Sequence, residues 1–170
     1  MTTTPEYSKT DLILATSATT FTGLSVIMAE FNLFSTVLEV ITFTQEVFNA
    51  KEKYPNNSLI QAMTNSFGQI MAEQNTVKEA ELIQPIERDL EKQNSLTILG
   101  FTGNLLNNVF NGLSEKVPPA ELQEFKEFLY RLGESIANAA GEGTFGTGTK
   151  ISVSEAKALE QLKVWLGLTE

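Results

Sequence analysis

Hydrophobic residues recur every three to four positions along most of this chain, which is the period of an amphipathic α-helix. No stretch alternates between apolar and polar residues for long enough to predict a strand. The clearest helical stripe follows Pro118-Pro119 and consists of Leu122, Phe125, Leu129, Leu132, Ile136 and Ala139. The pattern therefore predicts an all-α protein.

Caps and breaks divide this pattern into six or seven helices. We expect the first at Asp11–Ala29 with Ser8 or Thr10 as its cap, and we expect Gly100 and Gly103 to separate two later helices. The other predicted segments are a helix from a cap at Ser35 through Phe48 that ends before Tyr54, one from Asn57 or Ser58 through Met71, and helices at Ile86–Leu99, Leu105–Leu113, Pro118–Ala140 and from the capping box Ser152–Glu155 to Leu166.

The length of 170 residues fits a single domain, which we predict to be one compact helical bundle covering residues 1–170. Residues 1–10 are expected to be flexible and residues 141–151 to form a glycine-rich loop. Gly141-Glu-Gly143-Thr-Phe-Gly146 has the letters of a dinucleotide-binding loop. Such a loop joins a strand to a helix, whereas this one follows a predicted helix. We therefore interpret it as a flexible linker between two helices.

The composition excludes several kinds of chemistry. The chain has no cysteine and no histidine, which removes thiol catalysis, the commonest general base and the commonest transition-metal ligand. A net charge of −9 disfavours binding to nucleic acid or to anionic membranes. No nucleophile–base pair or cofactor fingerprint is evident, so we expect a non-enzymatic protein. The absence of a signal-peptide pattern at the first residues favours a cytoplasmic location.

One segment allows a membrane alternative. Leu12–Ala29 is 18 residues long without a charge, which reaches the lower limit for a transmembrane helix. Six of these residues are Ser or Thr and one is Gly. Small residues of this kind favour a helix packed closely inside a bundle, although a membrane span stays open at this point.

Two turns carry pairs of acidic residues. Glu30 and Glu39 flank the turn between the first two helices, and Glu142 and Glu155 flank the turn before the last helix. The similarity of the two turns indicates a worn internal helix-turn-helix duplication. Four carboxylates brought together would bind a hard divalent cation such as Ca²⁺. Alternatively, Glu39 and Glu155 are explained by the helix macrodipole, which favours acids near helix N-termini.

These two windows, from Ala29 to Glu39 and from Ala140 to Glu155, resemble the repeated element of the TerB-like (tellurite-resistance) helical domains. In that family an Ala-Asp-Gly at one helix end is followed by an Ile/Val-Ser-x-x-Glu opening of the next helix. The aspartate is absent at both places here, where Glu30 and Glu142 stand nearby. The resemblance implies a compact all-helical fold with an acidic, metal-binding surface.

Taken together, the residues favour a helical module that acts by binding a protein partner or another copy of itself. The alternative is a TerB-like cation-binding and stress-response module that uses Glu30, Glu39, Glu142 and Glu155. The two hypotheses differ in what they require of the acidic turns, because only the second needs the carboxylates to meet in space.

Overall fold

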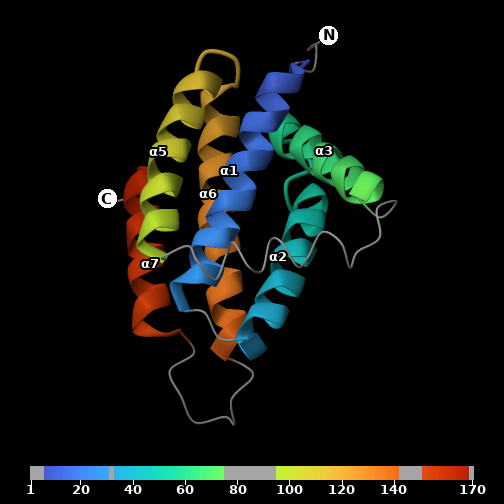
Figure 1. Ribbon diagram of the computed structural model, residues 1–170. Coiled ribbons are helices and arrows are strands. Elements are labelled where there is room, and N and C mark those ends of the chain that lie inside the picture. Colours follow the sequence, from blue (N-terminus) through green and yellow to red (C-terminus); the bar gives the residue numbers. More distant parts are fainter. Residues whose placement is uncertain (1–5, 31–32, 75–94, 142–150, 169–170) are drawn as a thin grey trace.

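A computed structural model describes residues 6–30, 33–74, 95–141 and 151–168 of the chain. In these residues it contains helices and no strand, which confirms the all-α prediction. The helices, shown in Figure 1, are α1 (Lys9–Ile27), the short 3₁₀ helix η1 (Met28–Glu30), α2 (Leu33–Lys53), α3 (Ser58–Gln74), α5 (Ser95–Leu113), α6 (Pro119–Gly141) and α7 (Val153–Trp165).

Helix α1 lies at the centre of the bundle and contacts α2, α3, α5, α6 and α7. Two of its buried hydroxyl groups bond to the helix itself: Thr19 Oγ1 donates to the Ala15 carbonyl at 2.9 Å and Ser25 Oγ to the Thr22 carbonyl at 2.8 Å. The buried hydroxyls of Thr16 and Thr22 have no hydrogen-bond partner among the described residues. Gly23 permits a close approach of α2, since a Cβ atom there would lie 2.5 Å from the Phe43 ring. By length and composition α1 is the one candidate membrane span among the described helices, and 56% of the window is buried in the bundle. A packed core helix fits this burial.

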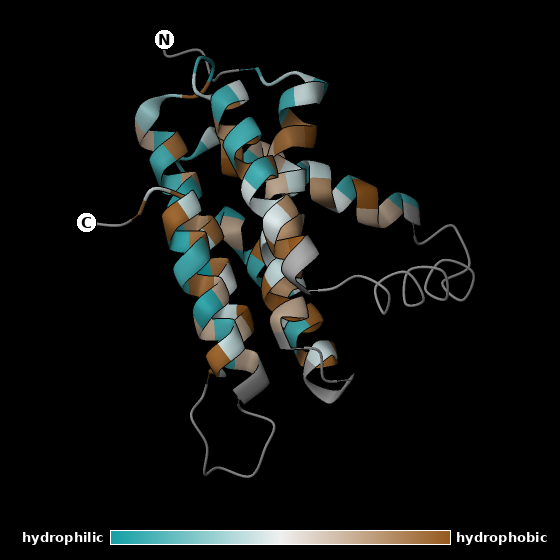
Figure 2. Cartoon of the chain, turned by 60° about the vertical axis from the view of Figure 1, so that its left-hand side comes forward, coloured by the Kyte–Doolittle hydropathy of each residue, from teal (hydrophilic) through white to brown (hydrophobic). Residues whose placement is uncertain are grey.

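Helix α6 is the amphipathic helix that its sequence predicts. Phe125, Leu129 and Ile136 are fully buried on one face, and Leu132 is 1% exposed beside them. Pro119 is the first helical residue, a position where the missing proline N–H costs nothing. Hydrophilic and hydrophobic residues alternate around the described helices in this manner over much of the bundle (Figure 2).

Helix α5 corrects one prediction. Gly100 and Gly103 do not separate two helices, because α5 runs through both without interruption. A Cβ atom on Gly103 would lie 2.5 Å from the Trp165 indole, so this glycine gives the α7 tryptophan room to pack against α5. Most of the predicted helix Ile86–Leu99 lies outside the described residues, which resume at Ser95.

The cap predictions have mixed outcomes. Ser8 and Asp11 form a capping box at the start of α1, and Ser152 and Glu155 form the one predicted for α7. The prediction that residues 1–10 are flexible is therefore wrong for residues 8–10, which form the cap and first turn of α1. The cap predicted at Ser35 is wrong, because α2 begins two residues earlier at Leu33 and includes it. Helix α6 ends at Gly141, and most of the glycine-rich loop lies outside the described residues.

The starts of α1, α3 and α6 meet at one end of the bundle, which we call the capped end (residues 7–11, 54–59 and 116–124). The Glu121 carboxylate of α6 accepts hydrogen bonds from the Ser58 backbone N–H at 2.7 Å and from the Leu59 N–H at 3.3 Å. Asn57 is fully buried, and its Oδ1 accepts from the Ile60 N–H at 2.9 Å. Helix α3 is therefore capped by its own asparagine and by a carboxylate from another helix.

Candidate functional site

The opposite end of the bundle contains the described helix ends that flank the two predicted acidic turns. We call it the acidic-turn end and define it by η1, the first turns of α2 and the first turn of α7. Glu39 and Glu155 are both buried there, with 1% and 3% of their surfaces exposed. Glu155 has a structural task, since its Oε2 accepts from the Ser152 N–H at 2.8 Å and closes the capping box.

Two described elements next to the predicted acidic turns, η1 and α7, contact one another (Figure 1). Glu30 ends η1, but its side chain lies outside the described residues, as does the whole of Glu142. In the part of the chain that the structure describes, no three acidic residues are grouped closely enough to hold a metal ion. The four-glutamate cation site therefore stays a prediction, with two of its members buried at the same end of the bundle.

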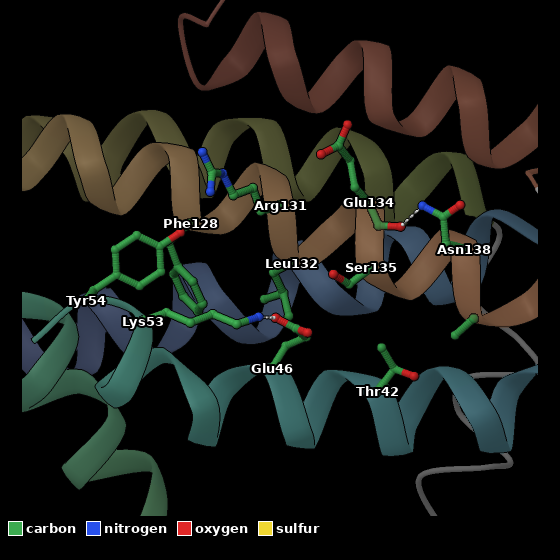
Figure 3. Close-up of a pocket in the computed structure, with 11 residues that line it drawn as sticks. Thr42, Glu46, Lys53, Tyr54, Phe128, Arg131, Leu132, Glu134, Ser135 and Asn138 are labelled. Carbon is green, nitrogen blue, oxygen red and sulfur yellow. Dashed lines mark hydrogen bonds and ion pairs between the residues drawn. The ribbon is translucent and has the colours of Figure 1, made fainter.

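A groove lies between α2 and α6, with a volume of about 790 Å³ (Figure 3). Phe128 and Leu132 of α6, which are almost fully buried, contribute apolar surface to it. Tyr54 closes one side with its ring edge-on to Phe128, at a centroid distance of 5.8 Å. The other lining residues are Thr42, Glu46, Lys53, Arg131, Glu134, Ser135, Asn138 and Ala139.

Charges of both signs line the groove. Lys53 Nζ lies 2.7 Å from Glu46 Oε2, so this cation is already paired. Arg131 and Glu134 add one charge of each sign from α6, which leaves the lining with no net charge. Burial raises the pKa of Tyr54, while the nearby Arg131 and Lys53 act in the opposite direction. Tyr54 is therefore a neutral hydroxyl at physiological pH.

The groove contains Ser135, but a serine needs a hydrogen-bonded base to become a nucleophile. Within the described ranges no hydrogen bond links Ser135 to a base. The groove can hold a ligand through its aromatic wall and its hydroxyl and amide groups. Its polar groups do not form the nucleophile–base arrangement that covalent catalysis requires.

The outer face of α2 is apolar, which the sequence pattern did not reveal. We call this face the α2 seam and define it as Val37, Ile41, Thr44 and Phe48. Val37 is 60% exposed and Ile41 is 48% exposed. Two flanking side chains, Leu38 and Val40, are exposed as well.

Most of the apolar residues by which the sequence identified α2 are not in the core. The sequence pattern identified this helix by its apolar residues Leu38, Ile41, Val47 and Phe48, and of these only Val47 is fully buried. The inward face of the first turns instead carries Glu39. A signal for this inversion is present in the sequence, because Leu33–Gln45 holds a single charged residue, and that residue is Glu39.

Comparisons of this chain with models of protein families, with curated proteins and with solved structures found no match.

Proposed function

We propose that this protein is a non-enzymatic helical module that works by association with a protein partner or with another copy of itself, and that the α2 seam is the contact surface. The observation that carries the proposal is the distribution of exposed large hydrophobic side chains. Of the ten among the described residues, five are on α2: Val37, Leu38, Val40, Ile41 and Phe48. Contiguous apolar surface of this kind is typical of interaction sites.

The cost of exposing this surface supports the same proposal. Apolar area in contact with water is unfavourable by roughly 25 cal/mol per Å², so several half-exposed Val, Ile and Phe side chains favour a covering partner. The remaining exposed hydrophobic residues, such as Ile13 and Val153, lie on other helices. Isolated residues of this kind are normal on a protein surface.

The overall charge limits the partners that we propose. With 21 acidic and 12 basic residues, the chain has no excess of cations with which to neutralise phosphates. We therefore propose a protein partner in the cytoplasm and exclude nucleic acid from the proposal. The seam offers no charge for steering, so association depends on apolar contact.

Photo-cross-linking in cells tests this proposal. A benzophenone amino acid is placed at Ile41 in the seam, and a control protein carries it at Lys157, an exposed position on α7. We expect light-dependent adducts from position 41 and none of the same size from position 157. Adducts that are absent at position 41, or equal at the two positions, would contradict the proposed contact surface.

The second candidate is a TerB-like cation-binding module with a stress-response role. The observation that favours it is the burial of Glu39 and Glu155 at one end of the bundle, where η1 contacts α7. Titration calorimetry with Ca²⁺ tests it on the wild type and on Glu39→Gln, which removes one charge without changing the size of the side chain. We expect binding heat in the wild type and little in the variant. Absence of heat in the wild type would eliminate this candidate.

A further inference from the structure

We infer that the α2 seam pairs with the α2 seam of a second copy of this chain, in antiparallel orientation about a two-fold axis between Ile41 and Thr44. This inference rests on the proposed function, because it names the partner of the same surface.

The spacing of the seam fits a helix as the occupant. Val37, Ile41, Thr44 and Phe48 follow one another at intervals of four, three and four residues. These intervals are those of the a and d positions of a heptad, whose side chains pack into the facing helix of a coiled coil. The surface is therefore shaped for a long helix and not for an extended strand or a small ligand.

Among the described helices, only α2 carries a row of three exposed large hydrophobic residues at heptad spacing, namely Val37, Ile41 and Phe48. The described surface that can pair with the seam is therefore the seam of another copy. Outside α2, the exposed large hydrophobic residues are Ile13, Ile70, Phe101, Val153 and Val164, which are distributed over four helices. Of these helices only α7 presents two of them, Val153 and Val164, which are eleven positions apart like Val37 and Phe48. The positions between them on that face are the exposed charged residues Lys157 and Glu160, so this face does not continue as an apolar seam. In a two-fold dimer the same patch serves both subunits, so a single seam is sufficient.

The absence of charge on the seam permits contact with a second copy. The chain carries a net charge of −9, which opposes contact between most pairs of surfaces on two copies. The exposed part of α2 from Val37 to Gln45 has no charged side chain, because Glu39 is buried. Two copies can therefore meet at the seam without placing like charges against each other.

The charges beyond the seam determine the orientation. Lys51 and Glu52 follow Phe48 on α2, and both are exposed. In a parallel pair each would lie beside the same residue of the second copy, which places like charges together. In an antiparallel pair they lie beside the uncharged beginning of the other α2, so the antiparallel arrangement avoids this repulsion.

The size of the seam predicts a weak dimer. Val37 and Phe48, the ends of the seam, are eleven residues apart, or about 16 Å along the helix. Such a patch offers a few hundred Å² per copy, which is less than the roughly 800 Å² per partner of a standard stable interface. We therefore expect a dissociation constant of about 10–100 µM, so that dimers form at high local concentration.

Disulfide trapping tests the pairing, and the chain suits it because it contains no cysteine. Val37→Cys and Phe48→Cys are prepared separately, mixed at about 100 µM, the upper end of the expected range of the dissociation constant, and oxidised gently. Antiparallel pairing places position 37 opposite position 48 of the other copy, so the mixture should give the mixed disulfide. Each variant alone should give little, because its two cysteines would be about 16 Å apart along the seam, beyond the reach of a disulfide.

A matched pair of cysteines provides the control. Ile13→Cys on α1 and Val164→Cys on α7 replace residues that are 54% and 57% exposed, and their mixture should show no preferred disulfide. Far-UV circular dichroism of each variant verifies the fold. Disulfides within the single variants at positions 37 and 48 would overturn the antiparallel arrangement.

Sedimentation equilibrium of the wild type separates this inference from the proposed function. A reversible monomer–dimer equilibrium that Ile41→Glu abolishes would support the second copy. A monomer at all concentrations, with benzophenone adducts at position 41 that contain a different protein, would overturn the second copy and retain the proposed function. A monomer without adducts, or with adducts only to residues 75–94 of the same chain, would overturn both.

Discussion

The two ends of the bundle differ in which side chains are buried and in which are exposed to water. At the capped end, buried polar groups have partners: Asp11 is 3% exposed, accepts from the Ser8 N–H at 2.9 Å and pairs with Lys116 Nζ at 2.6 Å. At the acidic-turn end, Glu39 is buried while Val37 and Ile41 of the same helix face water. The usual distribution of polar and apolar side chains is therefore inverted at the start of α2.

This difference separates stability from interaction. Hydrogen bonds to charged groups contribute more than neutral ones, and the capped end concentrates them at three helix starts. Val37 and Ile41 on the exposed face of α2 contribute little to folding, since much of their surface remains in contact with water. The Phe48 ring at the end of this face packs edge-on against Phe67 of α3, at a centroid distance of 5.9 Å. We interpret the capped end as the part that holds the bundle together and the α2 seam as the part that binds.

The largest effect is expected at the capped end, for Glu121→Ala. This change removes the acceptor of the Ser58 and Leu59 N–H groups and of the Ser58 hydroxyl, which donates to Oε2 at 2.6 Å. We expect the free energy of unfolding to fall by about 2–3 kcal/mol, because these donors lose a charged acceptor. Urea denaturation measures it.

Glu127→Ala is the matched control, since Glu127 lies on the same helix and accepts one bond of 3.3 Å from Gln123. It should cost less than about 0.5 kcal/mol, as most surface substitutions do. Equal losses in the two variants would remove the special role that we assign to the capped end.

A smaller, pH-dependent effect is expected at Asp11. The hydrogen bond from Lys116 and those from Ser8 lower the pKa of this carboxyl below its ordinary value. A lowered pKa in the folded state stabilises the protein above the unfolded pKa of about 3.9, and this contribution disappears as the pH falls through the folded value. Asp11→Asn should therefore cost about 1 kcal/mol at neutral pH, the size of a typical cap loss.

The difference in unfolding free energy between wild type and Asp11→Asn should shrink as the pH is lowered below 4. Urea midpoints at a series of pH values measure this convergence, and the other carboxyl groups cancel in the difference. Lys116→Met should shift the convergence to higher pH, because it removes the largest cause of the lowered pKa. A difference that is constant with pH would show that Asp11 does not titrate as described.

The smallest effect on stability is expected at the seam. Ile41→Glu replaces a residue that is 48% exposed, so the free energy of unfolding should change by no more than about 0.5 kcal/mol. Val47→Ala, on the buried face of the same helix, should cost about 1–3 kcal/mol. Urea denaturation at low protein concentration compares the two, and a large loss for Ile41→Glu would show that the seam belongs to the core.

Local patterns predicted the elements that depend on local contacts. The stripe on α6 was confirmed because Phe125, Leu129 and Ile136 share one face whatever surrounds them. The capping box of Ser152 and Glu155 was confirmed because its two residues are three positions apart. The all-α class follows from such signals repeated along the chain.

The rotation of α2 could not be predicted in the same way. Apolar residues occur on nearly all sides of its first half, at Val37, Leu38, Val40, Ile41 and Phe43, so the periodicity does not favour one inward face. Packing against α6 and α3 determines which of them are buried. The interruption expected at Gly103 failed for a related reason, because the role of this glycine depends on Trp165, which is distant in sequence.

The cap that α6 supplies to α3 has a consequence for the order in which the protein folds during synthesis. The bond from the Ser58 N–H to Glu121 joins residues 63 positions apart, and the bond from Asn57 to Glu124 joins residues 67 positions apart. Ribosomes make the chain from its N-terminus, so α3 leaves the exit tunnel long before its acceptor exists. Before α6 has emerged, the start of α3 has its local bond from the Ile60 N–H to Asn57 but lacks the acceptors on α6. We therefore expect the closing of this end to be a late step of folding.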